Sequence, residues 1–206
     1  MEEGQLPIVV IGRESFIGNK LNERLNLEGR IIVNLGGGEY KNGNVIAWNR
    51  GSRISAKTAV RELKRRYGMA DEVFIIFGRK WEDSFPESPF VLIEEVIDNE
   101  LKGLFFMVQE LYLAALQAGQ ETAFYFISEE IFDGKRPLST AAAAGFKGYA
   151  QAIMSSNSNF YMVGFELEGQ DTEGFINFVL KTTANRPHKR QNSWQVYPKG
   201  NKLFGR

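Results

Sequence analysis

The sequence predicts an α/β fold, in which a doubly wound, mostly parallel sheet of about seven strands is flanked by helices. Short apolar runs recur along the chain, and segments with helical periodicity separate most of them. Most of these runs are apolar throughout, which is typical of strands covered on both faces. A length of 206 residues fits one domain, and no linker or internal repeat divides residues 1–206.

The individual elements follow from these patterns in chain order. Strands are expected at 8–11, 30–35, 44–48, 72–77, 122–127, 160–167 and 193–197. Helices are expected at 17–27, at 55–67 with Ser55 as the cap, at 90–118 as one long helix or two joined ones, at 138–155 and at 173–184. About eight residues separate the second and third strands, fewer than a helical crossover needs, so a loop is predicted there.

Composition excludes several classes of protein. The 25 Lys and Arg residues balance 25 Asp and Glu residues, which argues against nucleic-acid binding and against a polybasic membrane surface. Without cysteine the chain has no disulfide, thiolate zinc site or thiol nucleophile, and its single histidine, His188, makes a Ser-His-Asp triad or an imidazole metal cluster improbable. No signal peptide or membrane-spanning run is visible, so a cytoplasmic protein without membrane contact is expected.

The first strand ends in a glycine turn, at the sheet edge where doubly wound folds bind ligands. Gly12 and Gly18 stand at the two ends of this turn. The turn resembles that of the short-chain dehydrogenase/reductase (SDR) family, whose classical form is G-x-x-x-G-x-G and whose extended form is G-x-x-G-x-x-G. Gly12 and Gly18 match both forms, whereas the middle glycine is replaced by Phe16 in the first and by Ser15 in the second.

The resemblance extends over most of the chain. Residues 96–103 are similar to the V-I-D-x-N-L-x-G stretch of the family, with Glu100 where the active-site Asn stands. Residues 126–129 resemble the I-S-S strand ending, with Glu129 at the catalytic Ser. Residues 139–148 resemble the Y-x-A-S-K-A-G-x-x-G helix, with Ser139 at the catalytic Tyr and Ala143 at the catalytic Lys. Residues 166–169 replace the Pro-Gly turn beside the nicotinamide.

The resemblance implies a Rossmann-type fold without the family's chemistry. In the family the tyrosine hydroxyl transfers a proton and the lysine lowers its pKa. Serine is too weak an acid for this role, alanine supplies no charge, and none of the seven tyrosines has a lysine four residues later. The Ser, Tyr, Lys and Asn set is therefore predicted to be absent.

If a cofactor is retained, the resemblance places it on the glycine turn and the second strand, at Gly12, Arg13, Ser15, Phe16, Ile17, Gly18 and Asn34. No acidic residue follows that strand to bind the ribose of NAD, and Arg13 would pair with a 2′-phosphate, which favours NADP. Ser15 or Phe16 would crowd the pyrophosphate. The expectation is therefore no cofactor, or NADP bound weakly.

Three further features each have a functional and a simpler interpretation. The carboxylates of Glu100, Glu129, Glu166 and Glu168 could converge to bind a divalent cation or to act as acid and base, or could be solvated glutamates. The basic loop 186–190 could bind phosphate or be a solvated surface. Trp81 could cover the crevice or anchor a loop. No resident metal is expected.

The long helix carries apolar residues around much of its circumference, at Leu104, Phe105, Met107, Val108, Leu111, Tyr112, Ala115 and Leu116. The next helix offers small residues at 141–145. In the SDR family these two helices pair with a second subunit's copies across a twofold axis. The resemblance therefore implies a homodimer, a homotetramer or a hetero-oligomer with an active SDR.

Three functions remain open on this evidence. The first is a non-catalytic oligomerising or partner subunit, a pseudoenzyme. The second is an atypical NADP-dependent oxidoreductase that uses Glu129 or a tyrosine from elsewhere as its acid. The third is a nucleotide or small-molecule sensor.

Overall fold

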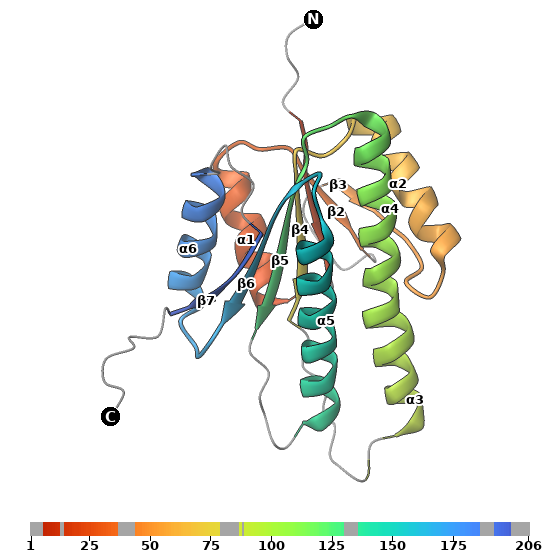
Figure 1. Cartoon of the computed structure of the whole chain (residues 1–206), viewed down its shortest axis with the longest axis vertical. Helices are drawn as coiled ribbons and strands as arrows, with labels where there is room; N and C mark the ends of the chain where they lie inside the picture. Colours follow the sequence, from red (N-terminus) through yellow and green to blue (C-terminus); the bar gives the residue numbers. More distant parts are fainter. Residues whose placement is uncertain are drawn as a thin grey trace, which may run out of the picture.

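A computed structural model of the chain describes residues 6–12, 15–36, 44–78, 87, 89–129, 136–185 and 192–198. Its centre is a seven-stranded sheet with the order β3-β2-β1-β4-β5-β6-β7, and all the strand pairs are parallel (Figure 1). The strands are β1 Ile8–Ile11, β2 Ile32–Leu35, β3 Asn44–Ile46, β4 Glu72–Phe77, β5 Ala123–Glu129, β6 Tyr161–Leu167 and β7 Ser193–Tyr197. The predicted fold class is confirmed.

The order of the strands reverses at β1, which pairs with β2 on one side and with β4 on the other. In doubly wound folds ligands bind outside the carboxyl ends of the strands at such a reversal, which here are β1 and β4. β2 and β3 pair in parallel although only residues 36–43 separate them. The loop predicted for this connection lies outside the described residues, apart from residue 36.

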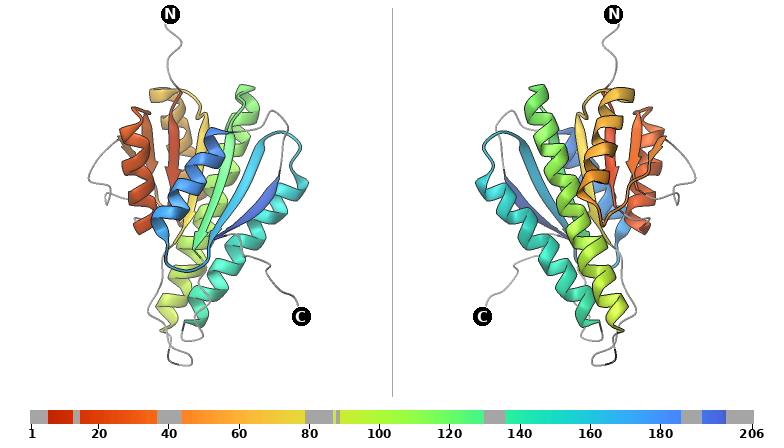
Figure 2. Two further views of the ribbon diagram at one scale, coloured as in Figure 1. Left: turned by 90° about the vertical axis from the view of Figure 1, so that its left-hand side faces the viewer. Right: turned by 90° about the vertical axis from the view of Figure 1, so that its right-hand side faces the viewer.

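Two helical layers cover the sheet. One face carries α2 (Arg53–Tyr67), α4 (Lys102–Ala118) and α5 (Pro137–Ser156), and the other carries α1 (Phe16–Leu27) and α6 (Thr172–Ala184) (Figures 1 and 2). Successive residues of β1 enter opposite cores, with Val9 and Ile11 under the first layer and Ile8 and Val10 under the second. This alternation between two buried faces explains why the strand is apolar throughout.

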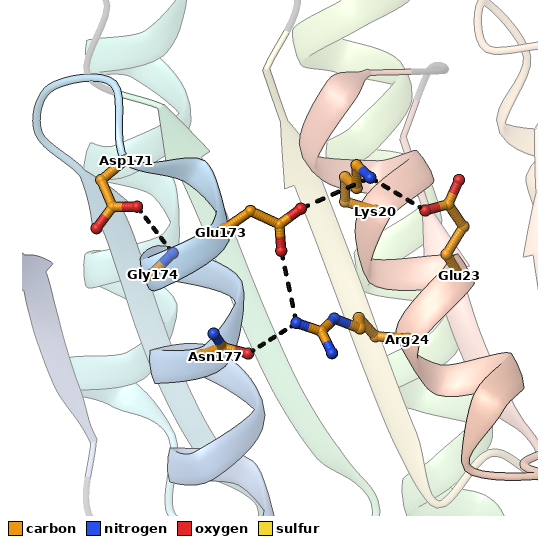
Figure 3. A network of polar contacts seen from close by, with 7 residues as sticks. All are labelled: Lys20, Glu23, Arg24, Asp171, Glu173, Gly174 and Asn177. Carbon is orange, nitrogen blue, oxygen red and sulfur yellow. Dashed lines mark hydrogen bonds and ion pairs between the residues drawn. The ribbon is translucent and has the colours of Figure 1, made fainter.

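Charged side chains join α1 to α6 on the second face (Figure 3). The Glu173 carboxylate lies 3.6 Å from Lys20 Nζ and 3.5 Å from Arg24 Nη2, and Arg24 Nη2 also donates to Asn177 Oδ1 over 3.2 Å. Asp171 caps α6 by accepting a hydrogen bond from the Gly174 amide. Exposed pairs of this kind contribute about 0–1 kcal/mol each, so they align the two helices more than they stabilise the fold.

The start of α2 corrects one prediction. The cap is Ser52, whose Oγ accepts a hydrogen bond from the Ser55 amide over 3.2 Å, and not Ser55 itself. Ser55 Oγ accepts instead from the Asn49 amide at 2.8 Å. Arg53 and Ile54 are exposed, so the first turn lacks the apolar periodicity that marks the rest of the helix. Two strand ends were also misplaced, because β3 ends at Ile46 and β5 continues to Glu129.

The predicted long helix is continuous but changes its winding. It comprises α3 (Phe90–Glu94), a π-helical segment η1 (Glu95–Leu101) and α4, and it ends at Gly119 with φ +63°. The wider π turn was not predicted; such segments often occur at functional sites. Of the helices within the described ranges, none combines the length and apolarity needed to span a membrane.

Candidate functional site

Gly12, the first glycine of the turn, follows β1 directly and lies against β4. Gly12 has φ +152°, and a Cβ added there would lie 2.7 Å from the Ile76 carbonyl oxygen. A Cβ on Gly18 would lie 3.1 Å from Ser15 Oγ. Both the backbone angle and the close packing require glycine at position 12, so the local packing of the fold already accounts for this glycine.

Ser15 caps α1 from within the turn. Its Oγ accepts a hydrogen bond from the Gly18 amide at 3.0 Å, and its carbonyl accepts one from the Asn19 amide at 2.9 Å. One amide that could face a phosphate is therefore already used inside the protein. Ile17 is buried in the core, and Phe16 is 61% exposed. Arg13, the residue predicted to meet a 2′-phosphate, lies outside the described residues.

Asn34 on β2 lies in the interior. Its side chain is 1% exposed, and its Oδ1 accepts a hydrogen bond from Asn22 Nδ2 on α1 at 3.1 Å. Leu35, the last residue of the strand, is also buried. Where the structure describes the end of β2, no polar side chain is presented to a ribose. Asn34, one of the residues expected to hold a cofactor if one is retained, is therefore engaged inside the protein.

Glu100 forms a buried ion pair in η1. Its Oε2 accepts a hydrogen bond from Arg50 Nη1 at 2.8 Å, and the two side chains are 4% and 9% exposed. The Arg50 guanidinium also lies 5.7 Å from the centre of the Trp48 ring. Gly103 permits this contact, since a Cβ there would lie 2.8 Å from Arg50 Cβ. Glu100 therefore ties the segment after β3 to the long helix.

The first turns of α5 face the sheet. Ser139 is fully buried and Ala143 is 9% exposed, while Ser128 is buried near the end of β5. The ring of Phe146 stacks on Phe77 at the end of β4, with 5.3 Å between centroids. α5 packs against η1, so the elements that carry Ser139, Ala143 and Glu100 are neighbours. Glu129 ends β5, and its side chain is not among those described.

Glu166 belongs to a separate cluster near the edge of the sheet. Its Oε2 accepts hydrogen bonds from Lys147 Nζ at 2.5 Å and from Trp194 Nε1 at 2.8 Å. The Trp194 ring covers Gly164, because a Cβ there would lie only 1.9 Å from its Cε3 atom. This cluster was not predicted from the sequence. The glycine and tryptophan that face each other on adjacent strands could have indicated it.

The four glutamates named as a possible cation site are not shown to converge. Glu100 pairs with Arg50, Glu166 pairs with Lys147, and Glu168 is exposed. Across the residues that the structure describes, no group of three His, Cys, Asp or Glu side chains could hold a metal ion. The basic loop 186–190 and Trp81 lie outside these residues.

Solved structures match this arrangement, although no protein-family model and no curated protein matches the sequence. One is a protein of Escherichia coli str. K-12 to which an oxidoreductase function is ascribed, with 12% identity, a TM-score of 0.78, and coverage of 93% of this chain and 94% of that one. Another is a short-chain dehydrogenase/reductase from Serratia marcescens, with 13% identity, a TM-score of 0.72, and coverage of 93% and 95%. The fold is that of these oxidoreductases. At such identities the likeness concerns the fold.

Within this SDR fold, α4 and α5 enclose an apolar groove of about 470 Å³. It is lined by Phe105, Phe106, Val108, Gln109, Tyr112, Leu113, Tyr149, Ile153, Ser156 and Asn157. The Tyr149 ring stacks on Phe105 at 3.8 Å between centroids and donates its hydroxyl to the Phe105 carbonyl over 3.3 Å. Burial raises the pKa of Tyr149 to about 12.

Fewer residues are free to form the interaction face than the sequence led us to expect. Five of the eight apolar residues named for that face are buried in the core of the single chain, at Leu104, Met107, Val108, Leu111 and Ala115. Phe105 and Tyr112 are half-buried, and Leu116 is exposed. Replacing Val108 by a charged residue to test association would therefore disrupt the core. Leu113 is a better position for such a substitution, because it is 37% exposed.

Proposed function

We propose that this chain is a non-catalytic subunit built on the SDR fold, and that it acts through association. The observation that carries the proposal is the complete burial of Ser139, which stands where the resemblance places the proton-donating tyrosine. A proton donor needs a suitable pKa and access to the reacting atom. A buried serine hydroxyl offers neither.

The neighbouring positions support the same conclusion. Ala143 stands where the resemblance places the lysine and has no charge. Glu100 stands where the resemblance places the asparagine, and its carboxylate is engaged by Arg50. Groups used for packing and for an internal ion pair thus occupy three of the four positions. Glu129 occupies the fourth and remains the candidate acid for the alternative function, an atypical NADP-dependent oxidoreductase.

Hydride transfer tests this proposal directly. NADPH oxidation is followed at high protein concentration against a broad panel of carbonyl substrates, and NADP reduction against alcohols. We expect no turnover above the protein-free control. Robust turnover that disappears in Glu129→Gln would overturn the proposal and establish the oxidoreductase alternative.

Association through the α4–α5 groove is the second half of the proposal. Apolar residues from both helices line the groove, and a partner that covered them would remove this surface from water. The partner is a second copy of this chain or an SDR with a complete catalytic set. Light scattering measures the mass, and Leu113→Glu is expected to lower it. Leu27→Glu is the matched control, because Leu27 is 82% exposed on α1, on the opposite face. Equal masses for all three proteins would contradict association here.

One observation favours a second candidate function, a nucleotide sensor. Trp48 lies two residues beyond the carboxyl end of β3, and its buried Nε1 has no hydrogen-bond partner in the described parts of the chain. A buried donor without an acceptor costs about 1–3 kcal/mol, which a ligand oxygen or nitrogen would recover. Calorimetric titration with NADPH, NADH and ATP tests this function. We expect weak or no binding of either dinucleotide, with NADPH preferred. Tight binding that Trp48→Phe weakens tenfold would favour the sensor.

A further inference from the structure

A groove between α2 and α4 carries a concentration of positive charge. It encloses about 350 Å³, and the residues that line it include Arg53, Lys57, Arg61 and Lys64 from α2 and Leu113 and Ala114 from α4. We call it the basic groove. α2 contains six Lys and Arg residues against one Glu, a net charge of +5 in a chain whose net charge is zero. The charge is therefore a local property of this helix and not of the whole protein.

Three of the cations that line the basic groove are not engaged inside the protein. Lys57, Arg61 and Lys64 are exposed, and with the residues that the structure describes they form no ion pair and no side-chain hydrogen bond. Arg53 differs, because its Nε donates to Glu110 Oε1 at 3.0 Å. The basic groove is thus neutralised at the Arg53 end and carries uncompensated charge along the rest of its length.

The three unpaired cations form one row. Their spacing of four and then three residues places them on one face of α2. At the helical rise of 1.5 Å per residue, Lys57 lies about 6 Å from Arg61 along the helix axis, and Arg61 lies about 4.5 Å from Lys64. A small anion can contact two neighbours in this row, whereas an extended partner can contact all three.

Apolar side chains lie beside this row, between the two helices. α2 packs against α4 on one outer face of the molecule (Figure 2, right). Val60 is buried, Ala114 is half-buried and Leu113 is 37% exposed. A flat lipid surface or a nucleic-acid backbone would contact the exposed charged groups but would leave the recessed apolar residues uncovered. The chemistry of the basic groove therefore fits a partner that carries acidic and apolar groups together.

The basic groove lies away from the carboxyl ends of the strands. α2 follows β3 and precedes β4, α4 precedes β5, and these strands are parallel, so both helices run toward the amino ends of the strands (Figure 1). Lys64 belongs to the last turn of α2, whereas Gly12 follows the carboxyl end of β1. A ligand of the basic groove would thus leave the glycine turn uncovered.

We infer that the basic groove binds an acidic, amphipathic helix of another protein. Acidic residues repeated every three or four positions match the row on α2, and an apolar stripe beside them covers Leu113 and Ala114. Two neighbouring helices leave a groove that a third helix can fill with its side-chain ridges. Opposite charges steer the partner to this face, and the apolar contact slows its release. The inference does not depend on association through the α4–α5 groove, because Leu113 is the one lining residue that the two grooves have in common.

A synthetic helix tests the inference. The probe is a fluorescent peptide that repeats Glu at spacings of four, three and four residues, with Leu directly after each Glu. A second peptide has the same composition in scrambled order, so it keeps the charge but loses the two faces. By fluorescence anisotropy the wild type should bind the amphipathic peptide at least about tenfold more tightly than the scrambled one. This binding should weaken at high salt, because the charged groups are exposed.

Two variants of α2 separate the basic groove from the general charge of the helix. Lys57→Gln/Arg61→Gln removes two cations that line the basic groove and should weaken binding of the amphipathic peptide at least about fivefold. Arg65→Gln/Arg66→Gln is the matched control. It removes the same charge from the same helix, at residues that bind Glu62 and do not line the basic groove, and should change binding less than about twofold. Circular dichroism confirms that both variants are folded.

A third variant separates helix docking from attraction by charge alone. Ala114→Lys adds a cation but fills the space between the two helices, so it should weaken binding of the amphipathic peptide. Tighter binding by Ala114→Lys, equal losses in the two glutamine variants, or equal binding of the two peptides would overturn the inference. Tighter binding of phosphatidylglycerol vesicles or of single-stranded DNA than of the peptide would also overturn it. None of these results bears on hydride transfer or on the mass of Leu113→Glu, which test the proposed function separately.

Discussion

Replacing Glu100 by glutamine should destabilise the fold far more than breaking an ion pair of the same length at the surface. The Arg50–Glu100 contact measures 2.8 Å, with side chains 9% and 4% exposed. Glutamine keeps the shape of the side chain but leaves the Arg50 guanidinium buried without its counter-charge. Removing one partner of a buried pair costs about 3–5 kcal/mol. For a chain of this length we therefore expect Tm to fall by about 6–20 °C.

The control for this prediction is already present in the same helix. Lys102 Nζ lies 2.8 Å from Asp98 Oδ1, but these side chains are 42% and 55% exposed. Lys102→Gln should therefore cost only about 0.3–0.5 kcal/mol, the usual value of an exposed i,i+4 pair. The two contacts have the same length but differ in burial and in sequence separation, so the comparison sets a buried tertiary ion pair against an exposed pair within one helix.

Urea unfolding followed by circular dichroism measures both variants. The double variant Arg50→Met/Glu100→Met should be more stable than either single variant, because it removes both buried charges together. A loss below about 1 kcal/mol for Glu100→Gln, or a loss equal to that of Lys102→Gln, would refute the view that Glu100 has a structural role.

Three other predictions use the same unfolding assay. Gly164→Ala should cost about 1–3 kcal/mol and shift the tryptophan emission, because the new Cβ would lie 1.9 Å from Trp194 Cε3 and must displace the ring. Ser15→Ala should cost about 1 kcal/mol by removing the α1 cap, whereas Ser15→Gly should cost only a few tenths. Burial raises the pKa of Tyr149 from 10.0 to about 12. The stability that the neutral side chain gives to the fold is therefore fully present below pH 10 and is lost as pH rises toward 12. Over this range the urea midpoint of Tyr149→Phe should fall less than that of the wild type. Identical pH profiles would contradict the last of these.

The fold could be predicted because the apolar runs and helical periodicities that indicate it are local and recur along the chain. A strand that is covered on both faces is largely apolar, so the apolar run of residues 73–77 in β4 indicated that this strand is buried. The start of α2 was misread because the residues after Ser52, Arg53 and Ile54, face water and show no periodicity. Glu100 in the π segment η1 is bound by Arg50, fifty residues earlier in the chain, and nothing in the local sequence indicates this contact.

For the candidate site, the sequence predicted which positions to look at but not how their side chains are buried or paired. The resemblance to the SDR family predicts that Glu100, Ser139 and Ala143 stand at the places of catalytic groups, but their burial depends on how α5 packs against η1 and the sheet. The partner of Glu100 could not be found from the sequence, because any of 25 Lys and Arg residues could have supplied the charge. The cations that line a groove beside α2 are different, since the spacing of Lys57, Arg61 and Lys64 already places them along one face of a helix.

Under the proposed function, packing occupies the positions where the resemblance places catalytic groups. A tyrosine at 139 would have to enter a fully buried site, and a lysine at 143 would bring a charge into a buried position three residues before Phe146, whose ring stacks on Phe77. The carboxylate at 100 is held by an arginine that also contacts Trp48. Each replacement is thus supported by neighbours that stabilise the present residue. Under the proposed non-catalytic function, introducing one residue of the SDR set at these positions would cost stability before it could contribute to chemistry.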